Sequence, residues 1–266
     1  MAGLTTLSIS ALAALLPAAL LPYRRGAARD VAFWLLLAVA VSGPLVLVWQ
    51  EFALGWRTGL AAALWITVAA SLVLFAILSA AMRETWRLSP LLLPYLFVVG
   101  CLATVWLHQP AHAVLVDGPS AWVRFHIAVS VATYAFLTIG AIAGFAVVLQ
   151  ERALKKKRPT ALTRILPSVA DAESMQVRLL VAGAIILGCD LLSGIGAQYV
   201  VSGAYIEFNH KVAFSLLTFG VIVALLLVHV LTGMRGRRVA RLLLVAYLFI
   251  TLAYPGVKFV TDVLLN

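Results

Sequence analysis

Two histidines, His126 and His210, are the residues whose type and spacing best support chemistry. Each lies near the start of a long apolar segment. A neutral imidazole is a common axial ligand of haem iron, so two imidazoles at matched depth can bind a haem b noncovalently. Three cations lie close to them in the sequence or at the same expected depth: Arg124, Lys211 and Lys258. The pattern predicts a bis-histidine haem site in which these cations contact the propionates.

The composition places these histidines in a membrane protein. The chain has 266 residues, of which 64% are hydrophobic and 11% are charged, and its mean hydropathy is +1.06. A soluble domain of this length does not need so much apolar surface, whereas a polytopic membrane protein does. The net charge of +10 then reflects cytoplasmic loops rather than nucleic-acid binding. We expect a lipid bilayer as a partner and no nucleic acid.

Eight apolar segments are long enough to cross a bilayer, at about 20 residues each. They lie near residues 4–22, 31–50, 58–80, 88–107, 122–149, 178–200, 210–232 and 239–261. We therefore expect an all-α, polytopic bundle of eight transmembrane helices. The loops are too short for a further domain, so residues 1–266 form one integral membrane domain, with four N-terminal helices in 1–107 and the histidine-bearing helices in 122–261. The first segment lacks a basic n-region, which favours a retained helix over a signal peptide.

The distribution of positive charge predicts the orientation. Sixteen of the 20 Lys and Arg residues lie in the loops after the first, third, fifth and seventh segments. Because cytoplasmic loops carry the excess of cations, both termini should face the outside of a bacterial inner membrane. His126 and His210 then lie within about four residues, or roughly 6 Å, of the outer ends of two helices that run in the same direction. The sequence supports their matched depth but not their proximity.

A polar stripe follows the first histidine along its helix. Positions i, i+4, i+7 and i+8 share one helical face and hold His126, Ser130, Thr133 and Tyr134. A polar stripe in lipid must turn toward protein or a cavity. An iron-bound imidazole also needs a hydrogen-bond acceptor for its second ring nitrogen, and Glu207 and Asn209 are candidates for that role.

Asp190, near the middle of the sixth segment, is the most costly residue in the chain to place in a bilayer. A charge at that depth costs about 2.5–3.5 kcal/mol on insertion scales, so we expect Asp190 to be protonated or paired. An alternative function is a transporter or channel component that uses Asp190 and the polar stripe. A second alternative is a membrane regulator that acts through the basic loop Arg152–Arg164.

The remaining histidines and the cysteines favour structural roles. His108 and His112 have i, i+4 spacing, but the proline between them argues against a metal-binding helix. His229 has no partner histidine at the inner side. Cys101 and Cys189 lie in separate segments without CxxC or CxxCH spacing, so we expect two buried small side chains and no covalent haem site.

Three longer motifs follow one another in the C-terminal half. They are FHIAVSVATYAFLTIGAIAGFAVVLQER (Phe125–Arg152), LLSGIGAQYVVSGAYIEFNHKVAFSLLTF (Leu191–Phe219) and GMRGRRVARLLLVAYLFITLAYPGVKFV (Gly233–Val260). In this order the chain resembles the CcsA/HemX cytochrome c assembly family, and within it the small, eight-helix, YpjD-like inner-membrane proteins. The resemblance implies a haem-binding protein associated with c-type cytochrome maturation, with other maturation proteins as partners. By motif, the family's histidine ligands fall on His126 and His210.

One feature of that family is missing from this chain. Members that deliver haem to apocytochromes carry a tryptophan-rich outer segment, ending in Trp-Asp, between the two histidines. Here the corresponding loop, Val200–Asn209, contains no tryptophan. This departure argues against an enzyme that attaches haem. We therefore expect an accessory role in cytochrome c assembly or haem handling.

Overall fold

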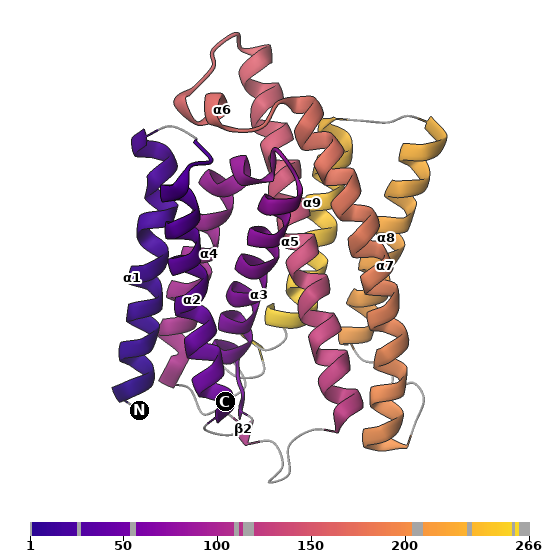
Figure 1. Cartoon of the computed structure of the whole chain (residues 1–266). Coiled ribbons are helices and arrows are strands. Elements are labelled where there is room, and N and C mark those ends of the chain that lie inside the picture. The colour runs from indigo at the N-terminus through magenta and orange to yellow at the C-terminus, as the bar shows by residue number, and fades with distance from the viewer. Residues whose placement is uncertain are drawn as a thin grey trace. The chain divides into compact units, whose positions relative to one another are not determined.

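The structure is a computed structural model (Figure 1). It describes the backbone of residues 2–25, 28–53, 57–108, 112–113, 120–203, 210–232, 236–256 and 259–260. At His210 and Lys211 only the backbone is described, and Lys258 lies outside the described residues. Within these ranges the chain is all-α apart from one short two-stranded ladder, which confirms the predicted fold class.

The described residues form nine α-helices. They are α1 (Ala2–Arg25), α2 (Val31–Ala53), α3 (Leu60–Ala81), α4 (Ser89–Val105), α5 (Ala121–Lys155), α6 (Ala161–Ile165), α7 (Val169–Ser202), α8 (His210–Thr232) and α9 (Arg237–Thr251). Shorter helical turns are η1 (Thr85–Leu88), η2 (Trp106–His108) and the π-helical η3 (Leu252–Gly256). The strands β1 (Arg57–Thr58) and β2 (His112–Ala113) pair antiparallel.

Seven helical spans among the described residues are long and apolar enough to cross a membrane, and they match the first seven predicted segments. The last predicted segment, 239–261, instead gives the shorter apolar helix Val239–Thr251 followed by η3. Pro255 lies inside that turn, and it removes a backbone donor where a longer α-helix would need one. The count of eight spans is therefore not confirmed. The predicted orientation stays a prediction.

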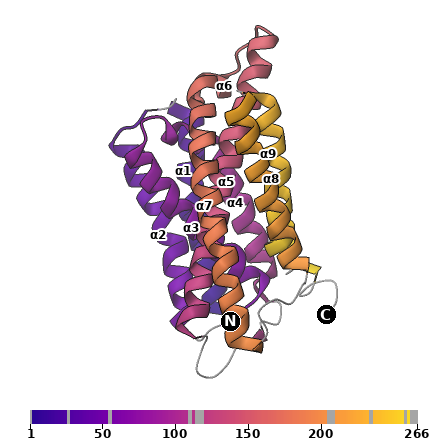
Figure 2. The ribbon, with the colours of Figure 1, turned by 90° about the vertical axis from the view of Figure 1, so that its right-hand side faces the viewer.

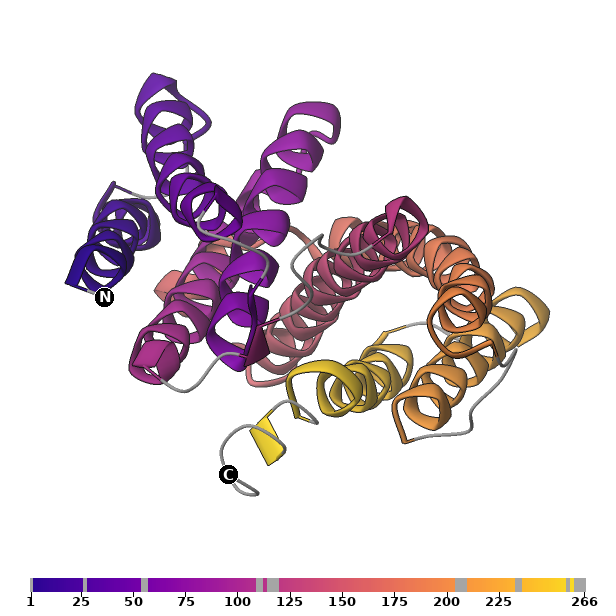
Figure 3. The ribbon, with the colours of Figure 1, turned by 90° about the horizontal axis from the view of Figure 1, so that it is seen from below.

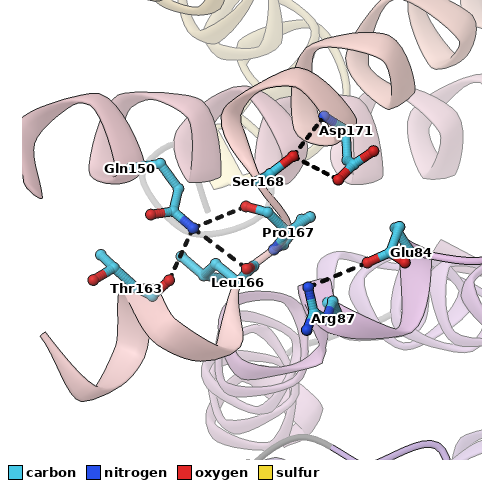
Figure 4. Close-up of polar contacts among 8 residues, drawn as sticks. All are labelled: Glu84, Arg87, Gln150, Thr163, Leu166, Pro167, Ser168 and Asp171. Atoms are coloured by element: carbon cyan, nitrogen blue, oxygen red, sulfur yellow. Dashed lines mark hydrogen bonds and ion pairs between the residues drawn. The ribbon is translucent and has the colours of Figure 1, made fainter. Parts of the chain in front are cut away.

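Helices α5 and α7 extend beyond their apolar segments into polar sequence. Helix α5 continues through charged residues to Lys155, and the exposed basic residues Lys156–Arg158 follow directly after it. Helix α7 begins at Val169, where Ser168 acts as the N-cap. Ser168 Oγ accepts from the Asp171 backbone N–H (3.2 Å) and donates to the Asp171 carboxylate (2.5 Å; Figure 4).

The chain divides into two compact units. Unit 1 comprises Met1–Val114 and Leu149–Asp171, and unit 2 comprises Leu115–Val148 and Ala172–Asn266. Helix α5 contributes to both units, because its last turns belong to unit 1. The single integral domain expected for residues 1–266 stays a prediction.

In unit 1, helices α1 to α4 lie side by side (Figures 1 and 3). Trp65 on α3 is fully buried. A Cβ built on Gly100 of α4 would lie 3.2 Å from the Trp65 ring and 2.9 Å from Leu12 of α1. A Cβ built on Gly43 of α2 would lie 3.0 Å from the Cα of Ala11 on α1. Small residues at these positions therefore let the helices approach closely.

One side chain holds the segment between α5 and α7 (Figure 4). Gln150 Nε2 donates to the backbone carbonyls of Thr163 (2.8 Å), Pro167 (2.9 Å) and Leu166 (3.3 Å). Within the same segment, Thr160 and Thr163 form a capping box at the start of α6. The bonds from Gln150 provide hydrogen-bond donors for backbone carbonyl groups near the C-terminal end of α6, which have no partner within that short helix.

The buried core of unit 2 joins α5, α7, α8 and α9. It includes Leu137, Leu187, Ile222 and Leu243. Helices α8 and α9 lie side by side (Figure 2), and a Cβ built on Gly188 of α7 would be in ordinary contact with a ring on α8. Cys101 is half-buried and Cys189 is exposed, so the prediction that both cysteines are buried is wrong.

Candidate functional site

His126 lies in the second turn of α5, and its side chain is 28% exposed. Its Nδ1 lies 2.9 Å from Ser193 Oγ and 3.2 Å from Asp190 Oδ1, both on α7. A Cβ built on Gly194 would lie 3.1 Å from His126 Cε1, so the ring lies directly against this glycine. Helix α7 therefore engages the imidazole through Nδ1 and through ring contact.

The hydrogen bonds around His126 are satisfied when its Nδ1 carries the proton. The Ser193 hydroxyl donates to the Asp190 backbone carbonyl (3.0 Å), which leaves its oxygen able to accept from His126 Nδ1. The Ser130 hydroxyl donates to Asp190 Oδ1, which also lies near Nδ1. In this tautomer a neutral His126 has a lone pair on Nε2, the atom that can then bind a metal.

Asp190 is nearly buried, with 9% of its surface exposed. Within the described part of the chain, its carboxylate contacts Ser130 and His126, both on α5. This pairing agrees with the expectation that Asp190 is protonated or paired, and it places Asp190 beside the predicted ligand.

Two residues of α7, Asp190 and Ser193, lie beside the Nδ1 of His126 as candidate acceptors. Glu207 and Asn209 lie outside the described residues, so their proposed role stays a prediction. The i, i+3 spacing of Asp190 and Ser193 puts them on one face of α7, and this spacing is the signal that sequence reasoning missed.

The polar stripe continues along α5 and meets α9. Tyr134 Oη lies 3.2 Å from Tyr247 Oη and 3.3 Å from Thr251 Oγ1. Thr138 Oγ1 lies 3.0 Å from Tyr247 Oη and also donates to the Tyr134 carbonyl. Thr133 is buried, and its hydroxyl has no hydrogen-bond partner among the described residues. The stripe thus faces protein, as predicted.

The other predicted site residues are less fully described. Arg124 is exposed near the start of α5. Helix α8 begins at His210, but the side chains of His210 and Lys211 lie outside the described set, and so does all of Lys258. The pairing of His126 with His210 and the three propionate contacts therefore stay predictions.

Trp122 lies one turn before His126 and also contacts α7. Its Nε1–H donates to the Ser193 carbonyl (3.0 Å). A Cβ built on Gly196 would lie 2.5 Å from Trp122 Nε1, closer than side chains tolerate. Glycine at 196 is therefore required for the indole to lie flat against α7.

We expect the Gly196→Ala variant to displace the Trp122 indole and remove its hydrogen bond. The matched control is Gly188→Ala, whose Cβ would lie 3.6 Å from Phe219, an ordinary contact. In both variants alanine replaces glycine within a helix, so both gain the same helix propensity. Gly196→Ala should therefore be less stable than Gly188→Ala by about 1 kcal/mol. Thermal unfolding of the two purified proteins in detergent measures this difference, and equal midpoints would contradict it.

Comparison with known proteins places these residues in a family. A family model described as "Cytochrome C assembly protein" matches residues 30–265. The chain belongs to the cytochrome c assembly family. The matched range includes α5, α7, α8 and α9, and thus all the described residues named above in contact with His126. Membership confirms the family resemblance, while the YpjD-like branch stays a prediction.

A relative from Azospirillum brasilense gives a second comparison. It is named as an uncharacterized 28.8 kDa protein in the nifR3-like 5′ region, and it is 52% identical over 264 residues, which cover 97% of each chain. No solved structure matches the chain. Cytochrome c assembly family membership, together with the apolar spans, supports a membrane protein with a role in cytochrome c biogenesis.

Proposed function

We propose that this member of the cytochrome c assembly family binds haem b noncovalently and has an accessory role in cytochrome c assembly or haem handling, in a bacterial inner membrane. The observation that carries the proposal is the state of His126. Its Nδ1 is engaged by Ser193 and Asp190, and a proton on Nδ1 leaves a lone pair on Nε2. Metal-binding histidines usually have this arrangement, with the second nitrogen donating to a carboxylate or another acceptor.

The residues around His126 fit an axial ligand of haem. The side chain of His126 is 28% exposed, and its Nδ1 is engaged by α7. The exposed Arg124, two residues earlier, supplies a cation suited to a propionate. His210 is the proposed second ligand, with Lys211 and Lys258 as further propionate contacts. A bound haem would supply one-electron chemistry or be passed on as cargo.

The proposed role is accessory because the chain lacks the surface that presents haem to an acceptor. The loop Val200–Asn209 contains no tryptophan. Other membrane proteins of cytochrome c maturation are the proposed partners, and they would supply the step that attaches haem. Within this chain, the residues bind and orient a haem rather than form its covalent bonds.

Absorption spectra of the full chain purified in detergent, oxidised and then reduced with dithionite, test this proposal. We expect a Soret band and sharp reduced α and β bands after reconstitution with haemin. His210→Ala should lose or shift these bands, and the control His229→Ala should keep them. A protein that remains colourless after reconstitution, or a His210→Ala spectrum identical to that of the wild type, would contradict the proposed bis-histidine site.

A further inference from the structure

We propose that Asp190 is a positioning residue for the His126 ligand and that, through this contact, it lowers the reduction potential of the bound haem. This inference rests on the proposed haem site and goes beyond it, because it assigns a role to a residue that does not touch the iron.

The contacts around His126 join two helices, α5 and α7. On α5, His126 and Ser130 lie one turn apart, and both contact Asp190 on α7. On α7, Ser193 lies one turn beyond Asp190 and contacts His126 as well. Each side chain therefore has a partner on the facing helix, and rotation of the imidazole would break contacts to both Ser193 and Asp190.

One arrangement of protons satisfies these contacts when Asp190 is a carboxylate. Ser130 then donates to the carboxylate, and Ser193 donates to the Asp190 carbonyl. With both hydroxyl protons used in this way, His126 Nδ1–H is the donor among the described residues that faces Ser193 Oγ and Asp190 Oδ1. In this arrangement Asp190 acts on both the orientation and the tautomer of His126.

The chemical consequence follows from the charge of the carboxylate. A carboxylate that accepts from Nδ1–H increases electron density on the imidazole and makes its other nitrogen a stronger donor to the metal. A stronger donor stabilises the ferric ion more than the ferrous ion, which lowers the reduction potential. The nearly buried position of Asp190 strengthens this effect, because surrounding water does not screen it.

The first test uses the haem-free full chain labelled with ¹⁵N-histidine. Nuclear magnetic resonance distinguishes the protonated from the unprotonated ring nitrogen, and the His126→Ala variant identifies the His126 signals. We expect the proton of neutral His126 on Nδ1. A proton on Nε2 would overturn the inference, whatever the protein does with haem.

The second test is the midpoint potential of haem in the Asp190→Asn variant. Asparagine keeps the shape and an acceptor oxygen but removes the charge. Loss of such a partner commonly weakens metal binding about 10–100-fold. If the ferric form alone is weakened tenfold, the potential rises by about 59 mV for a one-electron couple.

Thr138→Val is the matched control, because Thr138 lies on α5 but bonds Tyr247 on α9 instead of the residues around His126. Its potential should equal that of the wild type. An unchanged potential in Asp190→Asn, or an equal shift in Thr138→Val, would overturn the inference. If the wild type binds no haem, the proposed function fails, and the tautomer of His126 alone decides whether Asp190 holds the ring.

Discussion

Replacing His126 with glycine is expected to weaken haem binding by more than about 100-fold, and added imidazole should restore much of it. Loss of a partner that only supports a ligand costs about 10–100-fold, so loss of the ligand itself should cost more. Glycine leaves the space of the ring open beside Gly194, and free imidazole can occupy it and donate an N–H to the same groups of α7. Titration with haemin, followed at the Soret band, measures the dissociation constant with and without imidazole.

The control for this experiment is His229→Gly. His229 lies in the last turn of α8, and the substitution introduces glycine into a helix just as His126→Gly does. We expect its haem affinity to match that of the wild type and imidazole to have no effect on it. Wild-type affinity in the His126→Gly protein would exclude His126 as a ligand.

The largest expected effect on stability is that of Trp65→Ala in unit 1. Trp65 is fully buried, and its ring lies against Gly100, which has no side chain to move into the space that truncation leaves. Truncation of a buried aromatic side chain to alanine costs about 3–5 kcal/mol. Unfolding of the purified protein by increasing amounts of a denaturing detergent should show a much lower midpoint for this variant.

Trp65→Phe separates the ring volume from the indole N–H. The Nε1 of Trp65 has no hydrogen-bond partner in the described part of the chain. Phenylalanine keeps most of the apolar contact and removes this unsatisfied donor, whose burial is unfavourable. We therefore expect Trp65→Phe to lose far less stability than Trp65→Ala. Equal losses of stability in the two variants would show that the cavity left by the ring does not cause the destabilisation.

The helices of this chain could be predicted from sequence because apolar length alone identifies a membrane span. The ends of α5 and α7 could not, because charged residues continue a helix into water without changing its backbone hydrogen bonds. In the last segment the described α-helix is shorter than the apolar stretch. Its apolar character continues past Thr251, but the α-helix ends there and η3 follows, with Pro255 inside it.

The sequence predicts one helix face of the candidate site but not the residues on the helix opposite it. Helical periodicity puts His126 and Ser130 on one face, and the structure confirms that this face meets protein. Periodicity within one helix does not say which other helix lies opposite. Asp190 therefore stood apart from His126 in the sequence-based interpretation, as the basis of a transport alternative, although the two side chains are in contact.

The division of α5 between two units has a consequence for biosynthesis. Unit 1 needs residues 149–171, which the ribosome makes only after residues 115–148 of unit 2. At about 5–20 residues per second, synthesis of residues 115–171 takes several seconds. During that interval α1 to α4 are already made, but unit 1 lacks its last segment. Unit 1 is therefore completed only after most of α5, whose earlier turns belong to unit 2, has been made.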